Sequence, residues 1–298
     1  MNDLKTLSEQ WDIPVLKMKA QTRRRLFEQA IRRAQNTGFV LQVTSGLILA
    51  WRDTFETSWL GRLAFRAWAC CNASLTSNDL AQFSAKLAGF GACFAALSGW
   101  MPFPECTGFL NTGASVHAAV DGLRAEGVLD EKARVVVHPF GKVPEEWITI
   151  IVNHVGKTTW RDRHAKDYKL DPEKVRQRRT NWVEAQLRRG DGFLVAVLDT
   201  NRRLGAYVVV PLDRTRQRFG GPVIAGLNAV AGSIYEGRGF ARRAIIGAYK
   251  LTKSVWDTAI IQYQLENIPM AYIVDRSFFV RSCIRYDIHW QSDSPILR

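Results

Sequence analysis

Hydrophobic and polar positions follow the clearest pattern in the second half of the chain. Asp171, Pro172 and Glu173 form a helix-start signal: aspartate caps free N–H groups, proline suits the first helical position, and an early acid complements the helix dipole. Apolar positions then recur at helical spacing as far as Gly190. The pattern therefore predicts a helix between Asp171 and Gly190.

Apolar runs after this helix predict a series of strands and helices. Residues 192–198 and 204–210 flank a polar turn and are predicted to form an antiparallel hairpin that ends at Pro211. The remaining predictions are strands over 223–230 and 258–264, helices over 240–252 and 267–276, and a final strand over 278–290. This order predicts a mixed sheet flanked by helices, with a ligand at the carboxyl end of a strand.

The first half of the chain is less regular but also mixes both element types. Helices are predicted over 21–35 and 78–89, and apolar segments occur at 40–51, 92–97 and 114–116. We therefore expect an α/β protein in two parts, an N-terminal part over residues 1–140 and a C-terminal part over residues 141–298. Residues 134–137 predict a strand close to this boundary.

Composition indicates a globular chain. It has 298 residues, 47% of them hydrophobic, and lacks both a long uncharged apolar run and an apolar leader, so we expect a cytoplasmic protein without a membrane partner. Its five cysteines are odd in number and have no Cys-x-x-Cys spacing, and its five histidines have no ligand spacing. We therefore expect reduced cysteines and no metal site.

The charge balance predicts attraction to anions. The formal net charge is +13 and the isoelectric point is about 9.8. Nucleic acid, an anionic membrane surface and small polyphosphates would all be attracted to such a surface. Charge alone does not choose among them, and no nucleic-acid-binding motif is present, so nucleic acid is not the expected partner.

A glycine-containing loop between an apolar strand and a helix is the strongest functional signal. Gly237 and Gly239 lack a Cβ, so backbone N–H groups can approach an anion closely, and the helix that follows directs its positive end the same way. Arg238, Arg242 and Arg243 add positive charge for a di- or polyphosphate. A plain turn is the alternative interpretation of the same glycines.

The loop sequence Glu236-Gly237-Arg238-Gly239-Phe240-Ala241 resembles the acyl-CoA pyrophosphate loop of the GCN5-related N-acetyltransferase (GNAT) superfamily. That family usually has arginine or glutamine where Glu236 stands. Residues 160–164, 168–173 and 180–183 resemble two-domain sugar N-acetyltransferases of the TDP-fucosamine type. The resemblance implies a GNAT domain in the C-terminal part, preceded by a degenerate GNAT-like domain.

The resemblance also implies a reaction and a set of site residues. An acceptor amine attacks the thioester of acetyl-CoA, the acyl-donor substrate, and an acid protonates the departing thiolate. The implied acyl-CoA-binding residues are Ala229, Val230, Ala231, Gly237, Arg238, Gly239, Phe240, Ala241, Arg242 and Asn267.

The acid that protonates the thiolate is not at its usual position in this chain. Val274 replaces the tyrosine of the family motif, and Phe278 replaces a glycine that follows it. The remaining candidates for a catalytic role are Tyr272, Tyr286 and His289. For each of them a packing role is the alternative interpretation.

The sequence thus predicts an acyl-CoA-dependent N-acetyltransferase. Its expected acceptor is a small amine, such as an amino sugar or a nucleotide-linked amino sugar. A catalytically reduced acyl-CoA-binding or partner protein is the first alternative, and a basic nucleic-acid-binding protein is the second. The final strand leaves a homodimer open, because an exposed edge can pair across a two-fold axis.

Overall fold

The computed structural model describes residues 7–8, 11–124, 134–158, 163–227, 230–234 and 239–292. The chain forms two compact units, each built from more than one segment. Unit 1 comprises Met1–Ser115, Arg161–Lys174 and Cys283–Arg298, and unit 2 comprises Val116–Trp160 and Val175–Ser282. The division at residue 140 stays a prediction, because a compact unit and a domain defined by resemblance need not share bounds.

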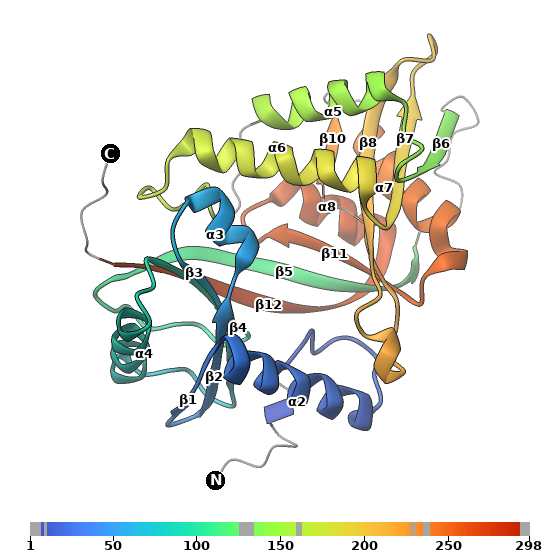
Figure 1. Ribbon diagram of the computed structural model, residues 1–298. Coiled ribbons are helices and arrows are strands. Elements are labelled where there is room, and N and C mark those ends of the chain that lie inside the picture. The colour runs from blue at the N-terminus through green and yellow to red at the C-terminus, as the bar shows by residue number, and fades with distance from the viewer. Residues whose placement is uncertain are drawn as a thin grey trace. The chain divides into compact units, whose positions relative to one another are not determined.

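Unit 1 contains a mixed sheet with helices. Its complete elements are α2 (Ala20–Thr37), β1 (Gly38–Val43), β2 (Gly46–Arg52), α3 (Thr54–Leu60), β3 (Ala64–Cys71), α4 (Ser77–Gly89) and β4 (Phe94–Gly99). The hydrogen-bonded strand order is β1-β2-β3-β4-β12-β5, to which β5 (Phe109–Leu123) and β12 (Phe278–Gln291) each contribute one part. Strands β3 and β4 are parallel, whereas β1/β2, β2/β3 and β4/β12 are antiparallel. Figure 1 shows the elements from α2 to β5 in blue to green and β12 in red.

Local signals explain where the elements of unit 1 begin. The Asp53 side chain accepts hydrogen bonds from the first backbone N–H groups of α3, and Thr76 and Asp79 form a reciprocal capping box at α4. Residues 40–51, whose polarity alternates poorly, belong to two strands that meet at a tight turn. Strand β2 is buried on both faces, since Ile48 and Leu49 lie in different hydrophobic clusters.

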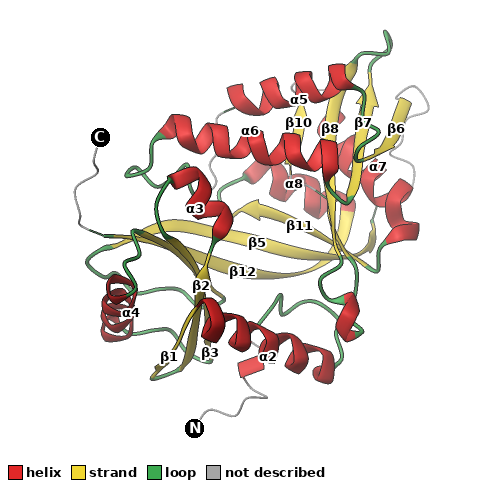
Figure 2. Ribbon diagram, viewed as in Figure 1, coloured by secondary structure: helices red, strands yellow, loops and turns green. Residues whose placement is uncertain are grey.

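Unit 2 contains elements that the sequence predicts and one helix that it does not. They are β6 (Arg134–Pro139), α5 (Glu145–Lys157), α6 (Pro172–Arg189), β7 (Gly192–Leu198), β8 (Leu204–Asp213), β9 (Ile224–Gly226), β10 (Val230–Ser233), α7 (Phe240–Thr252), β11 (Thr258–Gln264) and α8 (Ile268–Ser277). The strand order is β12-β5-β11-β9-β8-β7-β6, and β10 pairs with β8. Figure 2 shows helices α5 and α6 beside β7 and β8. The described chain has no helix with the length and apolar character that a membrane crossing requires.

The structure confirms α6 and the β7/β8 hairpin but corrects the predicted end of β8. Asp171 caps α6 by accepting a hydrogen bond from the Glu173 amide at 2.8 Å. Strand β8 continues past Pro211 to Asp213, because the Leu212 amide resumes the pairing by donating to the Asp191 carbonyl at 2.8 Å. Proline therefore removes one donor without ending the strand.

Two other segments differ from the sequence expectation. Residues 223–230, predicted as one strand, contain the short β9 and the start of β10, with residues 228–229 outside the described chain. Helix α5 was not predicted, although Ile148, Ile151 and Val155 have helical spacing and are all buried.

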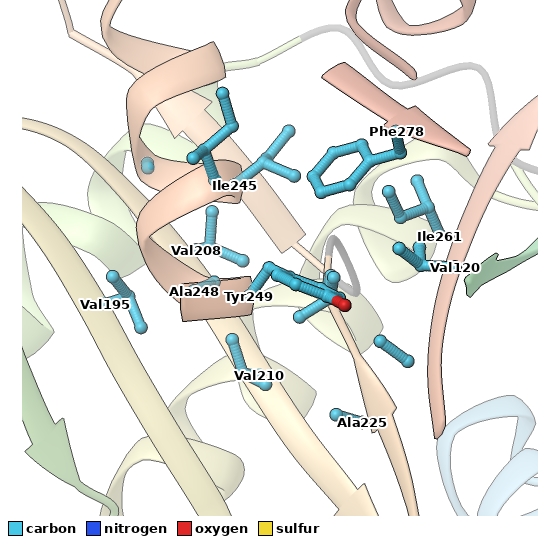
Figure 3. Close-up of a cluster of buried hydrophobic side chains, with 14 of the residues drawn as sticks. Val120, Val195, Val208, Val210, Ala225, Ile245, Ala248, Tyr249, Ile261 and Phe278 are labelled. Carbon is cyan, nitrogen blue, oxygen red and sulfur yellow. The ribbon is translucent and has the colours of Figure 1, made fainter. Parts of the chain in front are cut away.

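The sheet of unit 2 has a hydrophobic core on each face. Val195 and Val208 point toward α7 and α8, whereas their neighbours Leu194 and Tyr207 point toward α5 and α6. Figure 3 shows the first of these cores, where the Tyr249 and Phe278 rings lie 5.7 Å apart between centroids. The period-two alternation of β7 and β8 therefore builds both layers.

Adjacent phenylalanines at the start of β12 allow a matched test of this core. Phe278 is 0% exposed and Phe279 is 53% exposed. Because Phe278→Ala leaves a cavity, we expect it to lower the free energy of unfolding by about 3–5 kcal/mol, whereas Phe279→Ala costs less than about 1 kcal/mol. Urea denaturation of both variants measures the difference, and equal losses would contradict the assigned core.

Candidate functional site

The backbone of unit 2 changes partners at the end of β9. Strand β9 pairs in parallel with β11 over residues 224–226, and the Leu227 amide donates to the Ile260 carbonyl at 2.9 Å. Strand β10 then pairs with β8, while β11 continues to Gln264. In the described residues β10 and β11 are not hydrogen-bonded neighbours.

Helix α7 begins shortly after β10. Its N-cap residue, Gly239, has a φ of 70° and, as a glycine, has no side chain that could accept a hydrogen bond from the first turn. That turn contains no acidic residue, and a Cβ built on Gly239 meets no atom within 4 Å. The N–H groups of this turn and the positive end of the helix dipole thus favour an anion here.

The arginines that follow Gly239 are held by neighbouring groups. Arg242 donates from Nε to Ser277 Oγ at 2.9 Å and from Nη2 to the Arg276 carbonyl at 3.2 Å. The guanidinium of Arg243 lies 5.7 Å from the ring centroid of Phe240. Arg242 thus joins the first turn of α7 to the end of α8, a structural role that the sequence did not indicate.

Other predicted acyl-CoA-binding residues are only partly described. Ala229, Gly237 and Arg238 lie outside the described residues, as do Glu236 and residues 159–162 of the segment that resembles sugar N-acetyltransferases. Val230 and Ala231 lie on β10, opposite Val209 and Val208 of β8. Phe240 and Ala241 form the start of α7, and the Phe240 ring lies against Gly205. Together β10 and the start of α7 gather the described members of the predicted set, apart from Asn267.

Asn267 caps helix α8. Its Oδ1 accepts a hydrogen bond from the Met270 amide at 3.2 Å, and its own amide donates to the Gln264 carbonyl at 2.8 Å. These bonds fix the turn between β11 and α8. Helix capping is therefore sufficient to explain an asparagine at position 267.

The sequence did not indicate a polar pair that lies beneath β10, formed by the buried Tyr207 and the half-buried His154. The Tyr207 hydroxyl of β8 lies 2.8 Å from His154 Nδ1 of α5. Burial raises the pKa of Tyr207 and lowers the pKa of His154, so both are neutral at pH 7. A Cβ on Gly232 would lie 2.6 Å from the Tyr207 oxygen, so only glycine fits there. The alternation of β8 indicates the face of Tyr207, but no sequence spacing indicates its partner.

The predicted catalytic residues lie on different elements. Tyr272 is on α8 in unit 2, 59% exposed, with the Arg276 guanidinium 5.4 Å from its ring centroid. Val274, at the family's tyrosine position, is 2% exposed in the core. The valine at this position packs inside unit 2.

Tyr286 and His289 lie on opposite faces of β12 in unit 1. Tyr286 is paired with Gly99 and His289 with Ala96, both of β4. His289 is 1% exposed, and its Nδ1 lies 2.8 Å from Asp167 Oδ2. Tyr286 and His289 thus do not share a face of β12, Tyr272 belongs to unit 2, and the catalytic roles of all three stay predictions. Within the part of the chain that is described, no cluster of three or more histidine, cysteine or acidic side chains is arranged to hold a metal ion.

Comparison with known proteins shows the fold. No protein-family model and no curated protein matches the sequence. A conserved protein of unknown function from Staphylococcus epidermidis has a similar structure, with a TM-score of 0.51, 11% identity, and coverage of 77% of this chain and 85% of its own.

Two solved acetyltransferase structures have lower scores. A GCN5-related N-acetyltransferase from Kribbella flavida has a TM-score of 0.47 at 13% identity and covers 94% of this chain and 98% of its own. A GNAT-family acetyltransferase from Colwellia psychrerythraea has a TM-score of 0.39 at 13% identity, with coverage of 67% and 66%. At these scores neither likeness carries an argument about activity.

The capping role of Asn267 can be tested on stability. We expect Asn267→Ala to lower the free energy of unfolding by about 1 kcal/mol, because the Met270 amide loses its acceptor. Asn267→Ser keeps an acceptor and is expected to stay close to wild type. Thermal denaturation of the pair measures this, and equal stability of the alanine and wild-type proteins would contradict the capping role.

Proposed function

We propose that the chain is an acyl-CoA-dependent N-acyltransferase that uses acetyl-CoA and a small amine. The observation that carries the proposal is the path of the backbone from β9 to α7. The pairing of β9 with β11 ends at Leu227, β10 pairs with β8 instead, and α7 then begins at Gly239 with a turn that contains no acidic residue. A pantetheine arm has amide groups that suit the free edge of a strand, and a pyrophosphate suits a helix N-terminus.

The reaction needs little from the protein beyond positioning and polarisation. The amine nitrogen attacks the thioester carbon, the C–S bond breaks, the nitrogen loses a proton, and the thiolate gains one. A backbone N–H at the edge of β10 would polarise the carbonyl as negative charge develops on its oxygen. Of the three residues predicted for catalysis, Tyr272 is the one that shares unit 2 with β10 and α7, so we assign it the proton transfer to the thiolate.

An amino sugar, free or nucleotide-linked, is the acceptor class that we propose. This choice rests on the sequence resemblance of residues 160–164, 168–173 and 180–183 to sugar N-acetyltransferases. A net charge of +13 favours an acceptor that carries phosphate, because the surface attracts anions.

A second candidate is an acyl-CoA-binding protein without transfer activity. The burial of Val274 and Phe278 favours it, because the family's acid has no counterpart at its own position. Binding of acetyl-CoA without thiol release, across a panel of amines, would support this candidate over the enzyme.

Glycine variants test the proposed acyl-CoA site. Gly239→Trp places a large side chain at the start of α7, and Gly61→Trp is a matched control at the C-cap of α3. Both glycines have a left-handed φ, 70° and 68°, and open space at the Cβ position. We expect saturable acetyl-CoA binding by the wild type and by Gly61→Trp, and affinity lowered more than about tenfold by Gly239→Trp, in calorimetry at low salt.

The outcomes separate the functions. Equal affinity of all three proteins would place the acyl-CoA site elsewhere. Absence of acetyl-CoA binding by the wild type would overturn the acyltransferase proposal. If the same protein then bound nucleic acid with a steep salt dependence, the basic surface would be its functional feature.

A further inference from the structure

Strand β12 carries a row of polar residues into the interior of unit 1. Asp287, His289 and Gln291 alternate along the strand and are 2%, 1% and 6% exposed. Ile288 and Trp290 point to the other face, into a hydrophobic cluster. Burying such groups is costly unless each finds a partner, so the cover over this face must supply them.

Residues 163–170, which we call the covering segment, supply a partner for His289. Asp167 is 2% exposed, and its Oδ2 lies 2.8 Å from His289 Nδ1 and accepts a hydrogen bond from Gln291 Nε2 at 2.9 Å. The Lys169 amide donates to Asp167 Oδ1 at 3.0 Å. One carboxylate thus attaches the covering segment to two positions of β12.

A second attachment involves Asp287. Its carboxylate lies 3.3 Å from Arg163 Nη1 and 3.1 Å from Arg285 Nη2. The Ser98 hydroxyl of β4 donates to Asp287 Oδ1 at 2.5 Å. Asp287 therefore has hydrogen-bonding partners on the covering segment, on β12 itself and on β4.

The covering segment also reaches α3 through His164. His164 Nε2 lies 3.3 Å from Glu56 Oε1, and the two side chains are 4% and 1% exposed. The His164 and His289 rings are 5.2 Å apart between centroids. Arg66 of β3 lies 2.7 Å from Asp53 and 3.9 Å from Glu56. Two histidines thus lie together among buried charges of both signs.

The charge state of His289 follows from this environment. Burial lowers the pKa of His289, Asp167 opposes that change and Arg163 adds to it. Burial alone raises the pKa of Asp167, but hydrogen bonds from His289, Gln291 and the Lys169 amide together lower it. At pH 7, Asp167 is therefore charged and His289 is neutral, with its Nδ1–H donating to the carboxylate.

The other ring nitrogen of His289, Nε2, lacks a hydrogen bond like the one that Nδ1 makes. His289 Nε2 is buried and has no hydrogen-bond partner among the described residues. A proton added there would create a further donor in the interior, where the described residues supply no acceptor. The centroids of the His164 and Phe94 rings lie 5.2 Å and 4.9 Å from that of the His289 ring. Protonation of His289 is thus strongly unfavourable while the covering segment stays in place.

We propose that the His289–Asp167 pair is an acid-sensitive clamp, which holds the covering segment on β12 while His289 is neutral and releases it when His289 Nε2 takes a proton. The charged groups that face the pair belong to several elements. They are Asp53 and Glu56 at α3, Arg66 on β3, Arg163 on the covering segment, and Arg285 and Asp287 on β12. His164 is the other titratable group beside the ring.

The direction of the pH effect follows from linkage. The pKa of His289 in the folded protein lies below the ordinary value of 6.5, so the open segment binds a proton first as pH falls. The contribution of the clamp is therefore fully present above that value and decreases as pH falls below it. The lowered pKa of Asp167 adds a further loss of stability, but only at more acidic pH.

Hydrogen exchange of the full chain tests the proposal. Exchange of residues 163–170 and 285–291 is measured at pH 7.5 and 5.5 and corrected for the intrinsic pH dependence. We expect protection in the wild type to fall by up to about tenfold on acidification, because pH 5.5 lies one unit below the ordinary histidine pKa of about 6.5, at which the open segment takes up its proton. His289→Asn keeps an N–H donor for Asp167 but cannot titrate, so its protection is expected to change less than about twofold.

His138→Asn is the matched control, because His138 lies on β6 in unit 2. It is expected to lose protection in residues 163–170 as the wild type does. Equal acid sensitivity of His289→Asn and wild type would overturn the proposal, as would a wild type whose protection does not change. Should His289→Asn fail to fold, nitrogen NMR of the His289 ring in the wild type decides: absence of proton uptake where protection is lost overturns the clamp.

Discussion

The two-residue period of β12 is the constraint on which the rest of the structure depends. Phe278 and Val280 point into the core of unit 2, and Ile288 and Trp290 point into the core of unit 1. Because side chains alternate along a strand, this register places Asp287 and His289 on the opposite, buried face. A slip of one residue would exchange apolar and charged groups along the whole strand, so the polar pairing specifies the register.

In unit 2 the decisive feature is backbone geometry. Strand β9 has three residues, and its parallel pairing with β11 stops where β10 turns to β8. Gly232 permits this pairing, since any side chain there would meet the Tyr207 ring. The proposed acyl-CoA site thus depends on strand edges and a helix end, for which side-chain identity matters less than the absence of side chains.

Local signals explain how much of the fold the sequence predicts. Asp171 and Asn267 mark helix starts by capping chemistry, which acts over a few residues and is therefore readable. The division between β9 and β10 was missed, because it follows from a change of partner strand and leaves no change in polarity. His289 was read as a catalytic or packed residue, and its partner Asp167 could not be predicted, because 122 residues separate them in the chain.

The position of the covering segment in the chain determines which part of the structure the clamp controls. The covering segment lies between α5 and α6 in sequence, and Asp171, which caps α6, directly follows it. Ordering each residue of such a connection costs about 1–2 kcal/mol of conformational entropy, which the buried bonds of Asp167 and Asp287 must offset. Once His289 takes a proton, the entropy favours opening, while the cap on α6 remains intact because Asp171 accepts the hydrogen bonds of Glu173 and Lys174 of α6 itself. Acid would therefore free the connection without unwinding α6.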